Sequence, residues 1–99
     1  MKSILITEIE ILNTQAISCA KEFREGWLIL IGYKERLHSL HSVGGRDEEI
    51  KKFQCLVDGM VDTLSRKMMF VADRMSKMDI CLSNLHKIIE IENEQTEQV

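Results

Sequence analysis

The side chains in this sequence that could do chemistry are its histidines and cysteines. His38 and His41 lie one helical turn apart, a spacing at which two imidazoles can share a metal ion. A zinc site needs further ligands, and the nearby acids, Glu35 and the run Asp47–Glu49, complete no known ligand pattern. We therefore expect these histidines to be solvated and the protein to hold no metal or other cofactor.

The cysteines are widely spaced and form no C-x-x-C pair, and their number is odd: Cys19, Cys55 and Cys81. This usage is typical of small buried side chains in a reducing compartment, not of a disulfide framework. The sequence also shows no glycine-rich phosphate loop, no Glu-x-x-His pair and no nucleophile with an adjacent base. We expect the protein not to be an enzyme.

Length and charge limit the classes of protein to which this chain could belong. Ninety-nine residues form one domain, close to the size at which a single core becomes marginal. The 13 basic and 16 acidic side chains give a net charge of −3 without a basic block, which disfavours nucleic-acid binding. No stretch approaches the ~20 apolar residues of a membrane span, and the N-terminus lacks the pattern of a signal peptide. We expect a cytoplasmic protein.

The elements that must position any functional side chain are two long helices. Proline is absent, so nothing interrupts a helix by removing a backbone donor, and Gly44-Gly45 is the only paired breaker. We predict a single domain over 1–91, with a helix over about 4–42, a turn at 43–46 and a helix over about 47–91. Residues 92–99 are expected to form a polar, flexible tail. Thr7 to Glu10 fits a capping box for the first helix.

Apolar residues alternate at spacings of four and three in both predicted helices, as in a heptad seam. In the first helix the row is Leu5, Ile9, Leu12, Ala16, Cys19, Phe23, Gly26, Leu30, Tyr33, Leu37 and Leu40. In the second it is Val57, Val61, Leu64, Met68, Val71, Met75, Met78, Leu82, Leu85 and Ile89, with Ile50 upstream and polar Gln54 as an exception.

Folding at the diglycine makes the two rows meet along their length, so we predict an all-α, coiled-coil-like antiparallel helical hairpin. A three-helix alternative would break the first helix at Gly26 or Gly32, or the second at Gly59. An isolated glycine costs only ~1 kcal/mol relative to alanine, so we expect kinks at these glycines and not breaks.

More apolar residues are present than a two-helix seam can cover. The run Trp27–Ile31 is apolar around the whole helix, and so is Met68–Val71. An intermolecular interface explains this surplus, with oligomerisation or a partner completing the core; burial by a third packed segment is the alternative. Five of the six methionines lie between Met60 and Met78, and methionine adapts to irregular partners. The residues predicted to bind a partner protein are Trp27, Leu28, Ile31, Met60, Met69 and Phe70.

Hairpins of this length resemble two families of bacterial secretion systems. At the turn the chain has Val43-Gly44-Gly45, where the WXG-motif hairpins of type VII secretion have a tryptophan, any residue and a glycine. The glycine matches and the tryptophan does not. The small helical chaperones of type III secretion are similar over the whole chain in architecture, apolar seam and acidic balance. That resemblance implies a protein that keeps aggregation-prone subunits soluble by coiled-coil pairing.

The expected function is therefore that of a non-enzymatic adaptor or chaperone that packs an apolar helical face against the helices of a partner protein or of a second copy. Two alternative functions remain open. One is a structural subunit of a larger coiled-coil assembly, and the other is a small regulator that binds and blocks its target.

Overall fold

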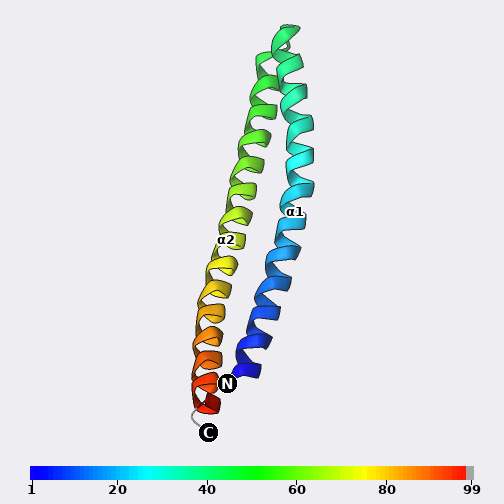
Figure 1. Cartoon of the computed structure of the whole chain (residues 1–99). Helices are drawn as coiled ribbons and strands as arrows, with labels where there is room; N and C mark the ends of the chain where they lie inside the picture. Colours follow the sequence, from blue (N-terminus) through cyan, green and yellow to red (C-terminus); the bar gives the residue numbers. More distant parts are fainter. Residues whose placement is uncertain (98–99) are drawn as a thin grey trace. The chain divides into compact units, whose positions relative to one another are not determined.

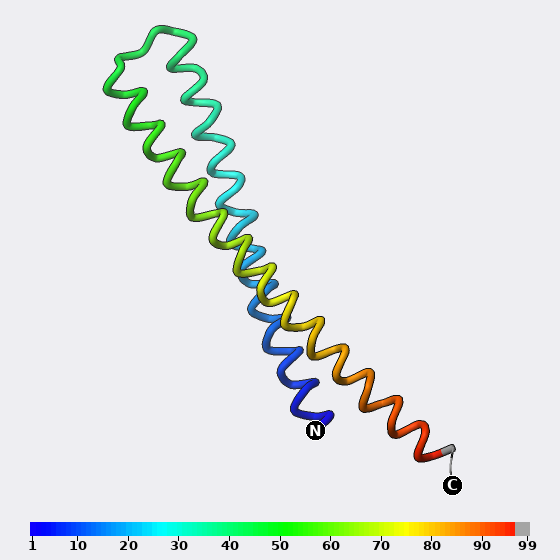
Figure 2. Tube along the Cα trace, turned by 90° about the vertical axis from the view of Figure 1, so that its left-hand side faces the viewer, coloured from blue at the N-terminus to red at the C-terminus, as the bar shows by residue number. Residues whose placement is uncertain are grey.

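The chain is all-α. Its structure, a computed structural model that describes residues 1–97, consists of α1 (Lys2–Ser42) and α2 (Asp47–Glu97), which pack against each other as a hairpin (Figure 1). The predicted fold class is confirmed, and α1 and α2 each run without a break through their glycines (Figure 2). Neither helix, over the residues described, has an apolar stretch long enough to cross a membrane.

The turn reverses the chain through a Schellman motif at the C-terminus of α1. Gly44 has a φ of 68°, in the left-handed region that favours glycine because no Cβ clashes there. The Gly44 N–H donates to the carbonyl of His41 at 3.4 Å, and the Gly45 N–H donates to the carbonyl of Leu40 at 2.8 Å. These two bonds satisfy carbonyls that the end of a helix otherwise leaves free. The diglycine thus terminates α1 as its sequence predicts.

The N-terminal end of α1 differs in detail from the prediction. α1 begins at Lys2, so the predicted capping box lies inside the helix, and the Thr7 hydroxyl donates to the carbonyl of Ser3 at 2.8 Å. α2 begins with three acidic residues, as expected for the positive end of a helix dipole. Its first backbone bond, from the Ile50 N–H to the Arg46 carbonyl at 3.1 Å, makes Arg46 the N-cap residue.

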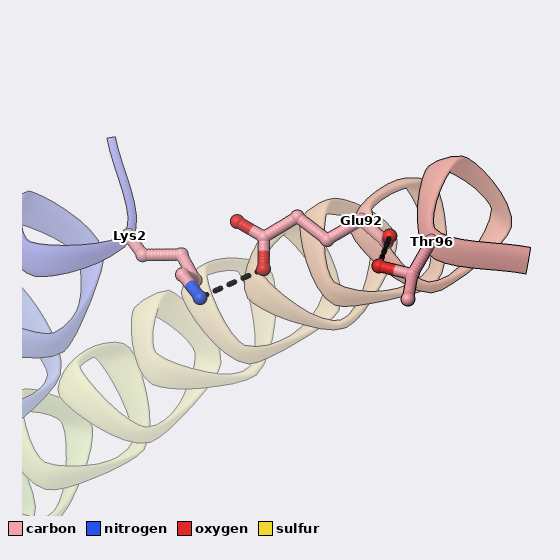
Figure 3. Close-up of polar contacts among 3 residues, drawn as sticks. All are labelled: Lys2, Glu92 and Thr96. Carbon is pink, nitrogen blue, oxygen red and sulfur yellow. Dashed lines mark hydrogen bonds and ion pairs between the residues drawn. The ribbon is translucent and has the colours of Figure 1, made fainter. Parts of the chain in front are cut away.

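The C-terminal end of α2 also differs. Residues 92–97, predicted to belong to a flexible tail, continue the helix to Glu97. Glu92 accepts a hydrogen bond from the Lys2 ammonium at 2.8 Å, and the Thr96 hydroxyl donates to the Glu92 carbonyl at 2.9 Å (Figure 3). These contacts give polar side chains at the end of α2 hydrogen-bond partners that the composition of the segment did not predict. Residues 98–99 of the predicted tail lie outside the described residues.

The hairpin divides into two compact units. The turn-proximal unit is Cys19–Met69, and it contains the turn. The turn-distal unit combines Met1–Ser18 of α1 with the part of α2 from Phe70 onward.

The core of the turn-proximal unit contains four buried side chains with exposed fractions of 2–9%: Leu30, Leu37, Val57 and Leu64. Five partly buried residues pack against them: Phe23, Tyr33, Ile50, Phe53 and Met60. Burial of one large aliphatic side chain contributes about 1.5–3 kcal/mol, so this small cluster is the main source of stability in the unit.

The seam of α1 is the predicted one. In α1, the residues that are not exposed are Leu5, Ile9, Leu12, Ala16, Cys19, Phe23, Gly26, Leu30, Tyr33, Leu37 and Leu40. Apolar residues also lie off this row, at Ile4, Ile6, Ile11 and Ile17 and in the run Trp27–Ile31. Polar residues interrupt every neighbouring row, so no second unbroken seam competes with the buried one.

The seam of α2 was only half correctly predicted. Its residues that are not exposed are Ile50, Phe53, Val57, Met60, Leu64, Lys67, Val71, Arg74, Met78, Cys81, Leu85 and Ile88. Every second position of the predicted row is therefore wrong, and five apolar residues assigned to the seam are 40–59% exposed: Val61, Met68, Met75, Leu82 and Ile89.

The two rows of α2 lie side by side on the helix, and residues near the turn favour the one that is buried. Phe53 lies in the seam, where its ring is 6.1 Å from that of Tyr33, whereas the alternative row has polar Gln54 at the same level. Farther along, the buried row includes Lys67 and Arg74. Their long apolar stems can lie in the seam while their charged ends reach its edge.

The turn-distal unit has a smaller core, whose buried members are Leu12, Ala16 and Cys81. Arg74 lies in its seam, with the guanidinium carbon 4.4 Å from the centroid of the Phe70 ring. The Nε atom of Arg74 is buried and has no hydrogen-bond partner in the described structure. The guanidinium also lies 3.6 Å from Oδ2 of Asp73, so an aromatic ring and a carboxylate both stabilise its charge.

Two glycines of α1 offer a test of the seam. A Cβ at Gly26 would lie 2.7 Å from Cδ2 of Leu64, which is 5% exposed, whereas a Cβ at Gly32 would meet nothing within 4 Å. We expect Gly26→Ala to destabilise the protein by about 1–3 kcal/mol through overpacking. Gly32→Ala should stabilise it by about 0.5–1 kcal/mol through helix propensity. Urea denaturation followed by circular dichroism measures both, and equal stabilisation by the two variants would contradict this seam.

Candidate protein-binding surface

Exposed apolar side chains surround the core of the turn-proximal unit. Apart from the turn, they are Trp27, Leu28, Ile29 and Ile31 on α1 and Leu56, Val61, Met68 and Met69 on α2, with exposed fractions of 39–72%. Over residues 1–97 the chain forms two helices only, so no third helix covers these side chains. Apolar surface of this kind generally marks an interface.

Three of the predicted binding residues form one continuous patch on α1, here called the Trp27 patch: Trp27, Leu28 and Ile31. Trp27 and Ile31 are four residues apart, and Leu28 and Ile31 are three apart, which are the spacings of neighbours on a helix surface. The indole of Trp27 stacks on the ring of Phe23, with centroids 6.2 Å apart and planes 17° apart. Because Phe23 packs on the core, it holds the indole in place while about half of Trp27 (47%) stays exposed.

The two predicted methionines of the turn-proximal unit differ from each other. Met60 is partly buried and packs against the core, so the structure assigns it to the seam more than to the surface. Met69 is 72% exposed, and its neighbours three and four residues away include Ser65, Arg66 and Asp73. Met69 is therefore an isolated apolar side chain on a polar face.

Phe70, the sixth predicted residue, belongs to the turn-distal unit. It is 37% exposed, and the guanidinium of Arg74 lies over its ring. Much of its aromatic face is thus already occupied within the unit, which leaves less of it available to a partner.

The turn-proximal unit also has a surface hollow of about 460 Å³. Its lining residues are Gly26, Cys55, Leu56, Gly59, Met60, Thr63, Leu64 and Lys67. The absence of a side chain at Gly59, where a Cβ would meet nothing within 4 Å, helps to leave this space open. Gly59 therefore shapes this surface and does not break α2. Cys55, predicted from the sequence to be buried, is exposed here.

An ion pair lies at the edge of this hollow. Lys67 Nζ donates to Oε2 of Glu22 at 2.7 Å, and the Cys19 thiol donates to the Lys67 carbonyl at 3.5 Å. The hydrogen bond and charge of Lys67 hold the pKa of the Glu22 carboxyl below its ordinary value, and the Glu22 hydrogen bond raises the pKa of Lys67. The pair joins α1 to α2 and fixes the position of the one lysine in the seam.

The turn-distal unit exposes a second group of apolar side chains. Beyond Phe70, they are Met1, Ile4, Ile6, Ile11 and Ile17 from the N-terminal segment and Met75, Ile80, Leu82, Ile89 and Ile91 from α2.

A hollow of about 550 Å³ lies beside α1, lined by Ser3, Ile4, Thr7, Glu8, Ile11, Leu12, Gln15 and Arg74. None of the exposed isoleucines of the N-terminal segment is among the predicted binding residues, although their number is a signal in the sequence.

The comparisons of this chain with protein-family models, with curated proteins and with solved structures find no match.

The Glu22–Lys67 pair predicts a pH dependence of stability. Because the Glu22 pKa is lowered on folding, its contribution is present above the ordinary carboxyl range and is lost as the pH falls through the lowered value. The raised Lys67 pKa makes its contribution persist until strongly alkaline pH. Glu22→Gln should therefore lower the urea midpoint slightly near neutral pH, and the difference from the unmodified protein should shrink in acid.

The matched control is Glu25→Gln, a change at a nearby exposed carboxylate of α1 for which the described structure shows no ion pair. It should leave the midpoint unchanged at every pH. If both variants shift the midpoint equally, the effect comes from net charge and not from the pair.

Proposed function

We propose that this protein is a non-enzymatic adaptor or chaperone that binds an amphipathic helix of a partner protein through the Trp27 patch. The observation that carries the proposal is the indole of Trp27, which is anchored by Phe23 and yet half exposed. Tryptophan in the centre of an apolar patch is the residue type that most often dominates binding energy.

Preorganisation supports this role. A side chain that is already held in one orientation loses little conformational entropy when a partner covers it. The stack on Phe23 provides that restraint for Trp27, and the helix backbone fixes Leu28 and Ile31 beside it. A rigid apolar patch with helical spacing fits the apolar stripe of another helix, whose anchors recur three and four residues apart.

The class of client follows from the same chemistry. A partner helix whose apolar face is exposed before assembly would be prone to aggregate, and covering that face would keep it soluble. This is the activity implied by the resemblance to the small chaperones of type III secretion. Met69 adds an adaptable side chain elsewhere in the same unit, which suits a client of variable shape.

The first experiment removes the patch. The partner is first captured from the cells in which the protein naturally occurs, identified by mass spectrometry and purified. Trp27→Ala combined with Leu28→Ala should then weaken its binding. We expect the dissociation constant to rise at least about 30-fold, because a central tryptophan contributes about 2 kcal/mol or more. Isothermal titration calorimetry measures the change, and circular dichroism checks that the variant remains helical.

Val43→Ala is the matched control, because Val43 is an apolar residue of the same unit that is 79% exposed but lies at the turn, outside the patch. It should bind the partner as the unmodified chain does. Trp27 is the only tryptophan, so its fluorescence emission should shift to the blue when the partner binds. Unchanged emission together with unchanged affinity of the double variant would disprove the role of the patch.

A further inference from the structure

The surface area of this chain is larger than a compact monomer needs. The chain exposes 7743 Å², whereas a compact monomer of 11.5 kDa exposes roughly 5,800 Å². The difference of about 1,900 Å² exceeds the ~800 Å² that each partner contributes to a stable interface of standard size. The chain therefore has area for an interface in addition to the Trp27 patch.

The turn-distal unit carries a row of apolar side chains suited to such an interface. Met75, Leu82 and Ile89 repeat every seven residues on α2, and they are 55%, 49% and 40% exposed. Each lies four residues after a seam residue, so this row, here called the outer row, runs directly beside the seam. A helix with a second apolar row beside its seam is typical of one that packs against two neighbouring helices.

We propose that the outer row is the contact surface between two copies of this chain. In this dimer the α2 helices of the two copies pack antiparallel around a two-fold axis at Leu82. Leu82 then meets Leu82 of the second copy, and Met75 of each copy meets Ile89 of the other. Such an interface is isologous, because the same surface of each copy contributes to it.

The charges beside the outer row favour this antiparallel arrangement. Asp79 lies three residues before Leu82 and His86 four residues after it, on the same side of the row, and both are exposed. His86 also lies 3.1 Å from the Glu90 carboxylate of its own helix. An antiparallel pair centred on Leu82 places Asp79 of each copy across from His86 of the other. A parallel pair has its two-fold axis along the helices, so it would place these groups of the two copies on opposite sides of the contact, where no Asp79 faces a His86.

The same symmetry favours a second copy over an unrelated helix as the occupant. Counted from Leu82 in either direction, an apolar side chain faces an apolar one and an acid faces a base. Binding of an unrelated partner helix would not require the side chains to be arranged symmetrically about Leu82. The outer row and the Trp27 patch belong to different units, so self-association and partner binding are assigned to different side chains.

The experiment measures the oligomeric state of the full chain by size-exclusion chromatography with light scattering over a dilution series. The unmodified protein should give twice the mass of the 11.5 kDa chain at high concentration and dissociate on dilution. Leu82→Glu places two like charges at the two-fold axis and should raise the dimer dissociation constant at least about tenfold. Its helical content should be unchanged, because Leu82 is an exposed residue of α2.

Ile80→Glu is the matched control. Ile80 is a similarly exposed apolar residue of the same unit, 60% exposed, but it lies on the opposite side of α2 from the outer row. It should leave the dimer intact. Weakening by both variants to the same degree would assign the effect to net charge and overturn the proposal.

A charge exchange tests the antiparallel direction. Asp79→Lys alone should weaken the dimer by about threefold, since exposed ion pairs contribute little. Adding His86→Glu should restore it, because each acid again faces a base. A double variant that stays as weak as the single one overturns the antiparallel contact.

Two further outcomes separate this proposal from the proposed function. A chain that is monomeric at all concentrations overturns the dimer but leaves partner binding by the Trp27 patch intact. A dimer that Trp27→Ala disrupts and Leu82→Glu does not would place the self-contact on the Trp27 patch, against both proposals. Dimer dissociation without a change in Trp27 emission supports the use of separate units.

Discussion

The constraint on which the structure depends is that two helices can bury only one face of each other. In each unit a single row of α1 meets a single row of α2, and the side chains on the remaining faces have no third element to cover them over residues 1–97. The core of the turn-proximal unit is correspondingly small, with four buried side chains and five partly buried ones. The apolar residues left outside the seam are a direct consequence of this geometry.

The seam is not purely apolar, and its charged members are accommodated in different ways. Lys67 extends to the edge and pairs with Glu22, so its charge stays close to water. Arg74 lies over the ring of Phe70 and 3.6 Å from the carboxylate of Asp73, while its Nε has no hydrogen-bond partner among residues 1–97. A long stem with a polar end suits the edge of a two-helix seam because solvent is always near. Because the row with Lys67 and Arg74 is the buried one, the apolar residues of the adjacent row are exposed. These are Val61 and Met68 in one unit and Met75, Leu82 and Ile89 in the other.

The two units expose different kinds of apolar surface. In the turn-proximal unit the notable feature is an anchored aromatic side chain, Trp27, with Leu28 and Ile31 beside it. In the turn-distal unit it is the outer row, which has the regular repeat of a coiled coil. A fixed aromatic anchor suits recognition of a client, whereas a symmetric heptad row suits pairing of identical helices. This contrast is why one surface is assigned to a partner protein and the other to a second copy.

The sequence by itself determined the two helices, the diglycine reversal and the whole seam of α1, because each rests on local chemistry or on one unambiguous apolar stripe. Of the predicted binding residues, it also identified Trp27, Leu28 and Ile31 as a surplus that a hairpin cannot bury. Only the tertiary structure decided which of two adjacent rows of α2 is buried. Hydrophobicity alone ranks the row with Val61 and Met68 above the one with Lys67, and the choice depends on what α1 presents: the ring of Tyr33 for Phe53 and the carboxylate of Glu22 for Lys67. Such contacts join residues 20 to 45 positions apart, and no local pattern contains them.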